Sequence, residues 1–151
     1  MKYLFYDCGF NVGHYLELLL GLKPNADREG MGIPRDVQTR DNSDFKYYAF
    51  EANPEILKYP KETLNMENPG VDLTINNKLV HVADGRTYAM AIRGGSGAGS
   101  TIYCKEAMKT GLHKIIQVES IDFAKFLKST AEESDRVIVK LDIEGSEYEV
   151  L

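Results

Sequence analysis

The sequence predicts an α/β domain built on a mostly parallel central sheet. Strand-like and helical segments alternate along the first third of the chain, and three apolar strands run directly into acidic residues. The composition is that of an ordinary globular protein, with 43% hydrophobic and 27% charged residues. A chain of 151 residues suits one core, so we expect a single domain over residues 1–151.

Short runs of β-branched, aromatic and aliphatic residues predict the strands. They span residues 2–7, 46–50, 71–75, 115–118 and 136–143. Right-handed crossovers bring the carboxyl ends of the first, second and last of these strands to one edge of the sheet. Because ligands of such sheets bind at that edge, the functional residues are expected directly after these strands.

Apolar residues at helical spacing and capping residues predict the helices. The first covers residues 13–22 and the second begins with Asn53 as N-cap and Pro54 as first helical residue. A third helix runs from a Ser120 cap to Leu127, and a fourth starts at Ser146.

Two connecting segments have their own signals. Asp84-Gly85 separates two apolar alternations, which predicts a β-hairpin over residues 79–92. Residues 25–44 are polar and rich in glycine, so we expect a long loop or insertion there.

The first candidate site is the turn that follows the first strand, Asp7-Cys8-Gly9-Phe10-Asn11-Val12-Gly13. Gly9 allows a tight turn and a close approach of the backbone to a ligand, and Gly13 lets a helix begin near the strand. Such a turn can bind a carboxylate through its N–H groups and an ammonium through Asp7. A plain strand-to-helix turn has the same pattern, and the GxGxxG spacing of dinucleotide loops is absent.

Acidic residues also follow the second and the last strand. Glu51 can accept hydrogen bonds from both hydroxyls of a ribose, although a solvated loop glutamate is the alternative. Asp142 and Glu144 lie two residues apart, and Lys140 shares their register in an extended strand. Because like charges placed together are costly unless a cation or water shares the site, a purely structural role is less favoured for this cluster.

Taken together, these segments resemble the FkbM family of methyltransferases that depend on S-adenosyl-L-methionine (SAM). The resemblance is carried by FYDCGFNVG, YAFEANP, IIQVESIDFAKFL and VKLDIEGSEYEVL, and it spans nearly the whole chain. It implies a Rossmann-like class I methyltransferase fold with the β-hairpin added. Relative to the family pattern, the C-terminal part of the usual sheet is missing after Leu151.

The resemblance also implies a role for each matching residue. Asp7, Gly9, Asn11 and Gly13 would hold the amino-acid end of SAM, Glu51 its ribose, and Asn53 and Asn77 its adenine side. Asp142 and Glu144 would be the catalytic residues that face the methyl group and the acceptor. Asp142 would lie nearest the chemistry, as a base, a metal ligand or an orienting group.

The expected function is O-methylation of a hydroxyl on a sugar, glycan or related metabolite, with a small-molecule or carbohydrate acceptor as partner. The alternative is a non-catalytic SAM- or nucleoside-binding module or an inactive fragment. An NAD-dependent oxidoreductase is disfavoured because Gly9 and Gly13 have GxxxG spacing.

Charge and composition restrict the remaining partners. A net charge of −5 without a basic run disfavours nucleic acid, and no apolar run is long enough to predict a membrane span. Cys8 and Cys104 lie in no metal-binding pattern, so we expect no metal site and a reduced, cytoplasmic setting. An incomplete sheet leaves an exposed edge, from which we expect either a homo-oligomer or a chain that is poorly active alone.

Overall fold

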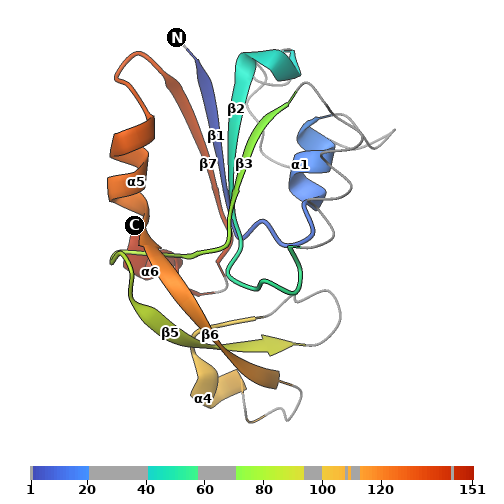
Figure 1. Ribbon diagram of the computed structural model, residues 1–151, viewed down its shortest axis with the longest axis vertical. Coiled ribbons are helices and arrows are strands. Elements are labelled where there is room, and N and C mark those ends of the chain that lie inside the picture. The colour runs from blue at the N-terminus through green and yellow to red at the C-terminus, as the bar shows by residue number, and fades with distance from the viewer. Residues whose placement is uncertain are drawn as a thin grey trace.

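The computed structural model describes residues 2–20, 41–57, 71–93, 100–107, 109, 113–143 and 145–151. These residues form a four-stranded sheet and a separate three-stranded sheet. Helices α1 (His14–Leu19) and α5 (Phe123–Thr130) lie on opposite sides of the four-stranded sheet, as Figure 1 shows. The α/β class predicted from the sequence is confirmed.

The larger sheet is parallel throughout. It contains β1 (Tyr3–Cys8), β2 (Phe45–Phe50), β3 (Asp72–Asn76) and β7 (Arg136–Leu141) in the order β3-β2-β1-β7. These strands agree with four predicted segments, although the last one ends two residues earlier than expected. A mostly parallel central sheet of this kind is consistent with a Rossmann-like methyltransferase fold.

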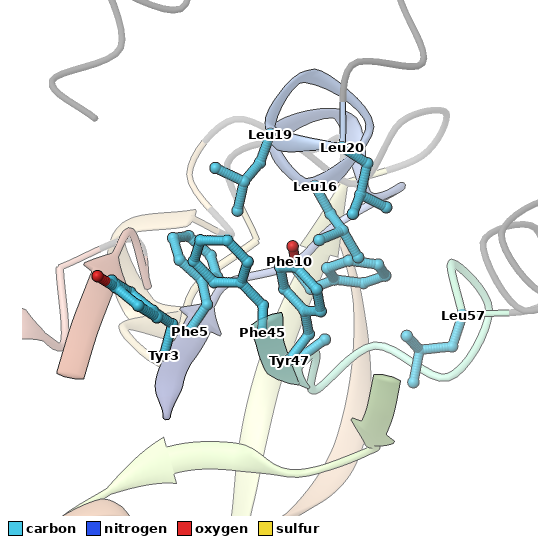
Figure 2. Close-up of a cluster of buried hydrophobic side chains, with 10 residues drawn as sticks. Tyr3, Phe5, Phe10, Leu16, Leu19, Leu20, Phe45, Tyr47 and Leu57 are labelled. Carbon is cyan, nitrogen blue, oxygen red and sulfur yellow. The ribbon is translucent and has the colours of Figure 1, made fainter. Parts of the chain in front are cut away.

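The core lies on both faces of β1, whose six residues are all buried. Tyr3 and Phe5 lie in one cluster with Leu16 of α1 and with Phe45 and Tyr47 of β2, which Figure 2 shows. Leu4 and Tyr6 point to the opposite face, where Phe123 of α5 covers them. This alternation is the period of two expected for a strand, and burial on both faces is typical of a central parallel strand.

The small sheet overturns the predicted hairpin. Its strands are β4 (Leu79–His81), β5 (Thr87–Arg93) and β6 (His113–Asp122), in the order β4-β6-β5. β4 pairs with β6 in parallel and β5 pairs with it antiparallel, so β4 and β5 do not pair with each other.

The Asp84-Gly85 turn is held to β6 by hydrogen bonds that the local sequence does not reveal. Gly85 N donates to Ser120 O at 3.0 Å, and Ser120 Oγ donates to Ala83 O at 2.6 Å. A ten-residue β6, far longer than the predicted 115–118 segment, offers both of its edges. The turn therefore crosses the end of β6 and places β4 and β5 on its two sides.

The helix boundaries differ from those predicted in three places. Ser120 lies within β6, and Asp122 caps α5 instead by accepting a hydrogen bond from Lys125 N at 3.0 Å. The first helix is shorter than predicted, His14–Leu19. Residues 54–57 form a turn, and residues 58–70, where the predicted second helix would continue, lie outside the described part.

The last predicted helix is present. α6 (Glu147–Val150) begins directly after Ser146, the residue at which the helix was predicted to start, and the Ser146 side chain makes no capping hydrogen bond. The remaining described helices are α4 (Cys104–Ala107) and the 3-10 turn η2 (Asn42–Asp44). None of the described helices is long and apolar enough to cross a bilayer.

The predicted insertion over residues 25–44 lies outside the described residues up to position 40. Among the described strands, β7 pairs with β1 alone. The single domain over residues 1–151 and the homo-oligomer both stay predictions.

Candidate active site

The candidate site lies at the carboxyl edge of the parallel sheet. Register places Asp7 of β1 beside both Ala49 of β2 and Lys140 of β7, so the three strands end at the same level. Gly9 N and Phe10 N both donate to Phe50 O, at 3.0 and 2.9 Å, and Asp142 N donates to Cys8 O at 3.0 Å. Backbone hydrogen bonds therefore hold the segments after β1, β2 and β7 together.

The first loop (residues 7–13) is shaped by left-handed backbone positions. Gly9 has φ +84°, Asn11 φ +51° and Gly13 φ +83°, and Asn11 Oδ1 accepts a hydrogen bond from Val12 N at 2.7 Å. A Cβ on Gly9 would lie 1.8 Å from Asp142 O. The close approach predicted for Gly9 is therefore to the backbone of the closing motif (residues 140–147). Gly13 O accepts a hydrogen bond from Glu17 N at 2.9 Å, which starts α1.

Glu51 connects the first loop to the segment after β2. Its side chain is buried, at 8% exposed, which rules out the alternative of a solvated loop glutamate. Oε2 accepts a hydrogen bond from Asn11 N and Oε1 accepts one from Asn53 N, each at 2.8 Å. Burial raises the pKa of Glu51, while these backbone donors oppose the rise.

Two asparagines bind the backbone segments beside Glu51. Asn53 is buried, and its Oδ1 accepts a hydrogen bond from Glu55 N at 3.0 Å. Asn77, just after β3, donates from Nδ2 to Glu51 O at 2.8 Å and to Ala52 O at 3.0 Å. The ends of β2 and β3 are thereby joined next to the buried carboxylate.

Asp7 is a buried carboxylate with one oxygen left without a partner. Only 2% of the residue is exposed, and Oδ2 accepts no hydrogen bond from the described part of the chain. Burial raises the pKa of Asp7 to about 6, and nearby Asp142 and Glu51 add to this effect. The Lys140 ammonium, 3.1 Å from Oδ1, acts in the opposite direction.

Lys140 is the functional residue that the sequence indicated least clearly. Its ammonium donates to Gly9 O at 2.7 Å and lies 3.6 Å from Asp142 Oδ2. It also lies 5.9 Å from the centre of the Tyr15 ring. The shared register with Asp142 was the signal for this residue, and the structure shows one cation placed between two carboxylates.

The closing motif leaves Asp142 open to solvent, with 68% of its side chain exposed. Glu144, the other predicted catalytic residue, lies outside the described residues. Glu147 belongs to the same acidic run of the sequence, where it had no predicted role, although an acidic residue in a first helical turn is a capping signal. Its carboxylate accepts hydrogen bonds from Ile143 N at 2.7 Å and Gly145 N at 2.8 Å, which closes the loop.

The arrangement therefore brings eight of the nine predicted site residues to one edge of the sheet. They are Asp7, Gly9, Asn11, Gly13, Glu51, Asn53, Asn77 and Asp142. The described residues contain no group of three histidine, cysteine, aspartate or glutamate side chains suited to a metal ion. A buried carboxylate, backbone turns and an exposed carboxylate suit a ligand with a cationic end and a reacting group beyond it.

A comparison with protein families identifies a match. The family described as methyltransferase FkbM domain matches residues 28–151. The matched range includes Glu51, Asn53, Asn77 and the closing motif, and it begins after the first loop. No curated protein and no solved structure matches the chain.

Replacing Gly9 with alanine should strongly destabilise the fold. The added Cβ would overlap Asp142 O, and alanine would have to adopt a left-handed backbone conformation that is unfavourable for it. We therefore expect the free energy of unfolding to fall by about 3 kcal/mol or more. Chemical denaturation measures this loss. Gly85→Ala is the matched control, because φ is +65° but nothing lies within 4 Å of its Cβ. It should cost only about 1–2 kcal/mol, and equal losses in the two variants would contradict the account.

Asp7→Asn should stabilise the protein at neutral pH and not at acidic pH. The folded-state pKa of about 6 exceeds the ordinary value of 3.8, so the folded protein binds a proton more tightly than the unfolded chain. The wild type therefore loses stability as pH rises from about 4 to about 6, and the variant lacks this loss. Denaturation across that range should show the variant's advantage growing with pH, whereas parallel curves would contradict the raised pKa.

Proposed function

The chain belongs to the FkbM methyltransferase domain family, and from this premise we propose that it transfers a methyl group from SAM to a hydroxyl on a sugar, glycan or related metabolite. The observation that carries the cofactor assignment is the buried Asp7 carboxylate, whose Oδ1 faces the Lys140 ammonium while Oδ2 has no hydrogen-bond partner among the described residues. SAM carries an ammonium and a sulfonium, and its ammonium would give this second oxygen the donor that offsets the cost of burying it.

The residues around Asp7 fit the rest of such a cofactor. Asp7 would bind the ammonium, and the left-handed turns at Gly9, Asn11 and Gly13 would lie along the amino-acid end. Glu51 uses one lone pair of each oxygen for a backbone N–H, which leaves acceptor capacity for the ribose hydroxyls. Asn53 and Asn77 would border the adenine side of the pocket.

The chemistry needs little from the protein beyond placement. When bound, SAM supplies an electrophilic methyl group. Asp142, exposed at the same edge, would hold the acceptor hydroxyl in line and accept its proton. Glu144, two residues further along, is the second acidic candidate. The Lys140 ammonium contacts both the Asp142 carboxylate and the Gly9 carbonyl, and so keeps Asp142 close to the first loop.

A neutral hydroxyl acceptor suits the charge of the protein. The chain has a net charge of −5, and Asp7, Glu51 and Asp142 all lie at the site. Such a field repels the phosphates of nucleic acid, and proteins that bind nucleic acid usually have a basic surface. The hydroxyl of a sugar or glycan carries no charge and can donate to a carboxylate.

Calorimetric titration with S-adenosylhomocysteine tests the cofactor pocket. We expect micromolar binding by the full chain, and a loss of at least about tenfold in Asp7→Asn and in Glu51→Ala, because each removes a charged partner of the ligand. Asp72→Asn is the matched control, since its carboxylate is exposed and lies at the start of β3. Unchanged affinity in both site variants would refute the proposed pocket.

A panel of hydroxyl acceptors tests the transfer reaction. We expect labelled methyl groups from SAM to appear on monosaccharides or glycosides and not on the corresponding amines. Asp142→Asn should reduce the rate by about 10²–10⁴-fold while leaving S-adenosylhomocysteine affinity unchanged, as for the loss of a general base. Binding of S-adenosylhomocysteine without transfer to any acceptor would instead support a non-catalytic module.

A further inference from the structure

A chain of polar contacts outside the proposed cofactor pocket ends on the closing motif. His81 of β4 is buried, with Nε2 2.8 Å from Glu149 Oε2 of α6. Its Nδ1 lies 3.3 Å from the Tyr88 hydroxyl, and the two rings are 4.6 Å apart. The other Glu149 oxygen accepts a hydrogen bond from the Tyr103 hydroxyl at 3.1 Å, and that hydroxyl lies 3.4 Å from Gly145 O.

The Tyr103 ring is held between the small sheet and the closing motif. Gly145 has φ +101°, and a Cβ there would lie 3.2 Å from the ring, so the aromatic side chain packs on a glycine. The segment that carries Tyr103 is joined to the small sheet, because Thr101, two residues earlier, exchanges two backbone hydrogen bonds with Ala91 of β5, at 2.8 and 2.9 Å. Tyr103 is 43% exposed, so its ring lies at the surface of the described residues.

Contacts continue from Gly145 to the catalytic candidate. Glu147 ties the N–H groups of Ile143 and Gly145 into one loop, and Asp142 lies at the start of that loop. The Asp142 backbone in turn packs directly on Gly9 of the first loop. A shift of Gly145 would therefore change the position of Asp142 relative to the first loop.

The Tyr103 hydroxyl acts here as a donor. Its hydrogen bond to Glu149 raises the pKa of the phenol, so the proton stays on the oxygen at neutral pH. A protonated phenol that donates to a carboxylate is a poor proton acceptor for a substrate. This favours a role in placing the closing motif over a role as a base.

We propose that Tyr103 is a positioning residue, held by the His81–Glu149 pair, through which the small sheet fixes the closing motif and with it Asp142. The part that concerns the acceptor rests on the proposed function. The contact between the small sheet and the closing motif does not depend on it. The proposal assigns β4 and β5 a part in the reaction although they lie outside the parallel sheet.

Hydrogen exchange of the full chain tests the mechanical part without any ligand. Tyr103→Phe keeps the ring and removes the hydroxyl, and His81→Phe removes the contact to Glu149. We expect each to speed exchange at residues 142–149 by about tenfold, the effect of losing a hydrogen bond to a charged group, while β1 and β2 stay protected. His81→Gln, whose amide can still donate to Glu149, should restore most of the protection. Tyr148→Phe is the control, since Tyr148 is 93% exposed.

Coupling between the Tyr103 and His81 substitutions is the sharper test of the proposal. Tyr103 and His81 are linked through Glu149, so the double variant should exchange no faster than the faster single variant. Additive effects, unchanged exchange, or equal losses in His81→Gln and His81→Phe would overturn the proposal. Faster exchange throughout β1 and β2 would also overturn it, since this would indicate global destabilisation.

The kinetic arm uses SAM with the hydroxyl acceptors of the panel. Tyr103→Phe should lower kcat by about tenfold and leave the KM for SAM within about twofold, because the cofactor residues are untouched. Equal changes in both parameters would contradict a role limited to the closing motif. If the wild type binds no S-adenosylhomocysteine, the proposed function fails, whereas the exchange experiment still decides whether Tyr103 positions residues 142–149.

Discussion

The Lys140 ammonium is the interaction on which the candidate site depends. It lies against Asp7, Asp142 and the Gly9 carbonyl, and so joins the end of β1 to the end of β7. Asp7 is buried and Asp142 is exposed, so the two carboxylates repel and desolvation favours the neutral form of Asp7, and the cation held between them opposes both effects. Lysine suits this task, because a compact ammonium can face several oxygens at once. Without it, the first loop and the closing motif would meet through like charges.

Two glutamates organise the loops around that ion pair in the same way. Glu51 gathers the N–H groups of Asn11 and Asn53, and Glu147 gathers those of Ile143 and Gly145. A carboxylate that accepts two backbone donors fixes a loop and satisfies groups that would be costly to bury alone. The glycines permit the turns, and the carboxylates select one arrangement of them. The acidic character of the site thus has a structural part as well as a chemical one.

Much of this could be predicted from the sequence, because the informative residues follow apolar strands directly. Asp7, Glu51 and Asp142 each end such a run, and parallel strands must bring these ends together. The small sheet could not be predicted in the same way. Asp84-Gly85 is a local hairpin signal, but Gly85 N donates to Ser120 O and Ala83 O accepts from Ser120 Oγ, so both hydrogen bonds join the turn to a residue far along the chain. The partners of Lys140 and Glu149 were hidden for the same reason, since they depend on long-range contacts.

The position of β1 has a consequence for biosynthesis. β1 is made before both of its neighbours in the sheet, β2 and β7, and 131 residues separate Gly9 from the lysine that binds its carbonyl. During translation β1 can pair with β2 early, while its other edge stays open until residues 136–141 emerge. An unpaired edge flanked by apolar side chains is the kind of surface that attracts chaperones or other nascent chains. The site is therefore completed only after Lys140 has been made, and a ribosome that stalls before Lys140 leaves behind a chain with an open sheet edge and no cation at Asp7.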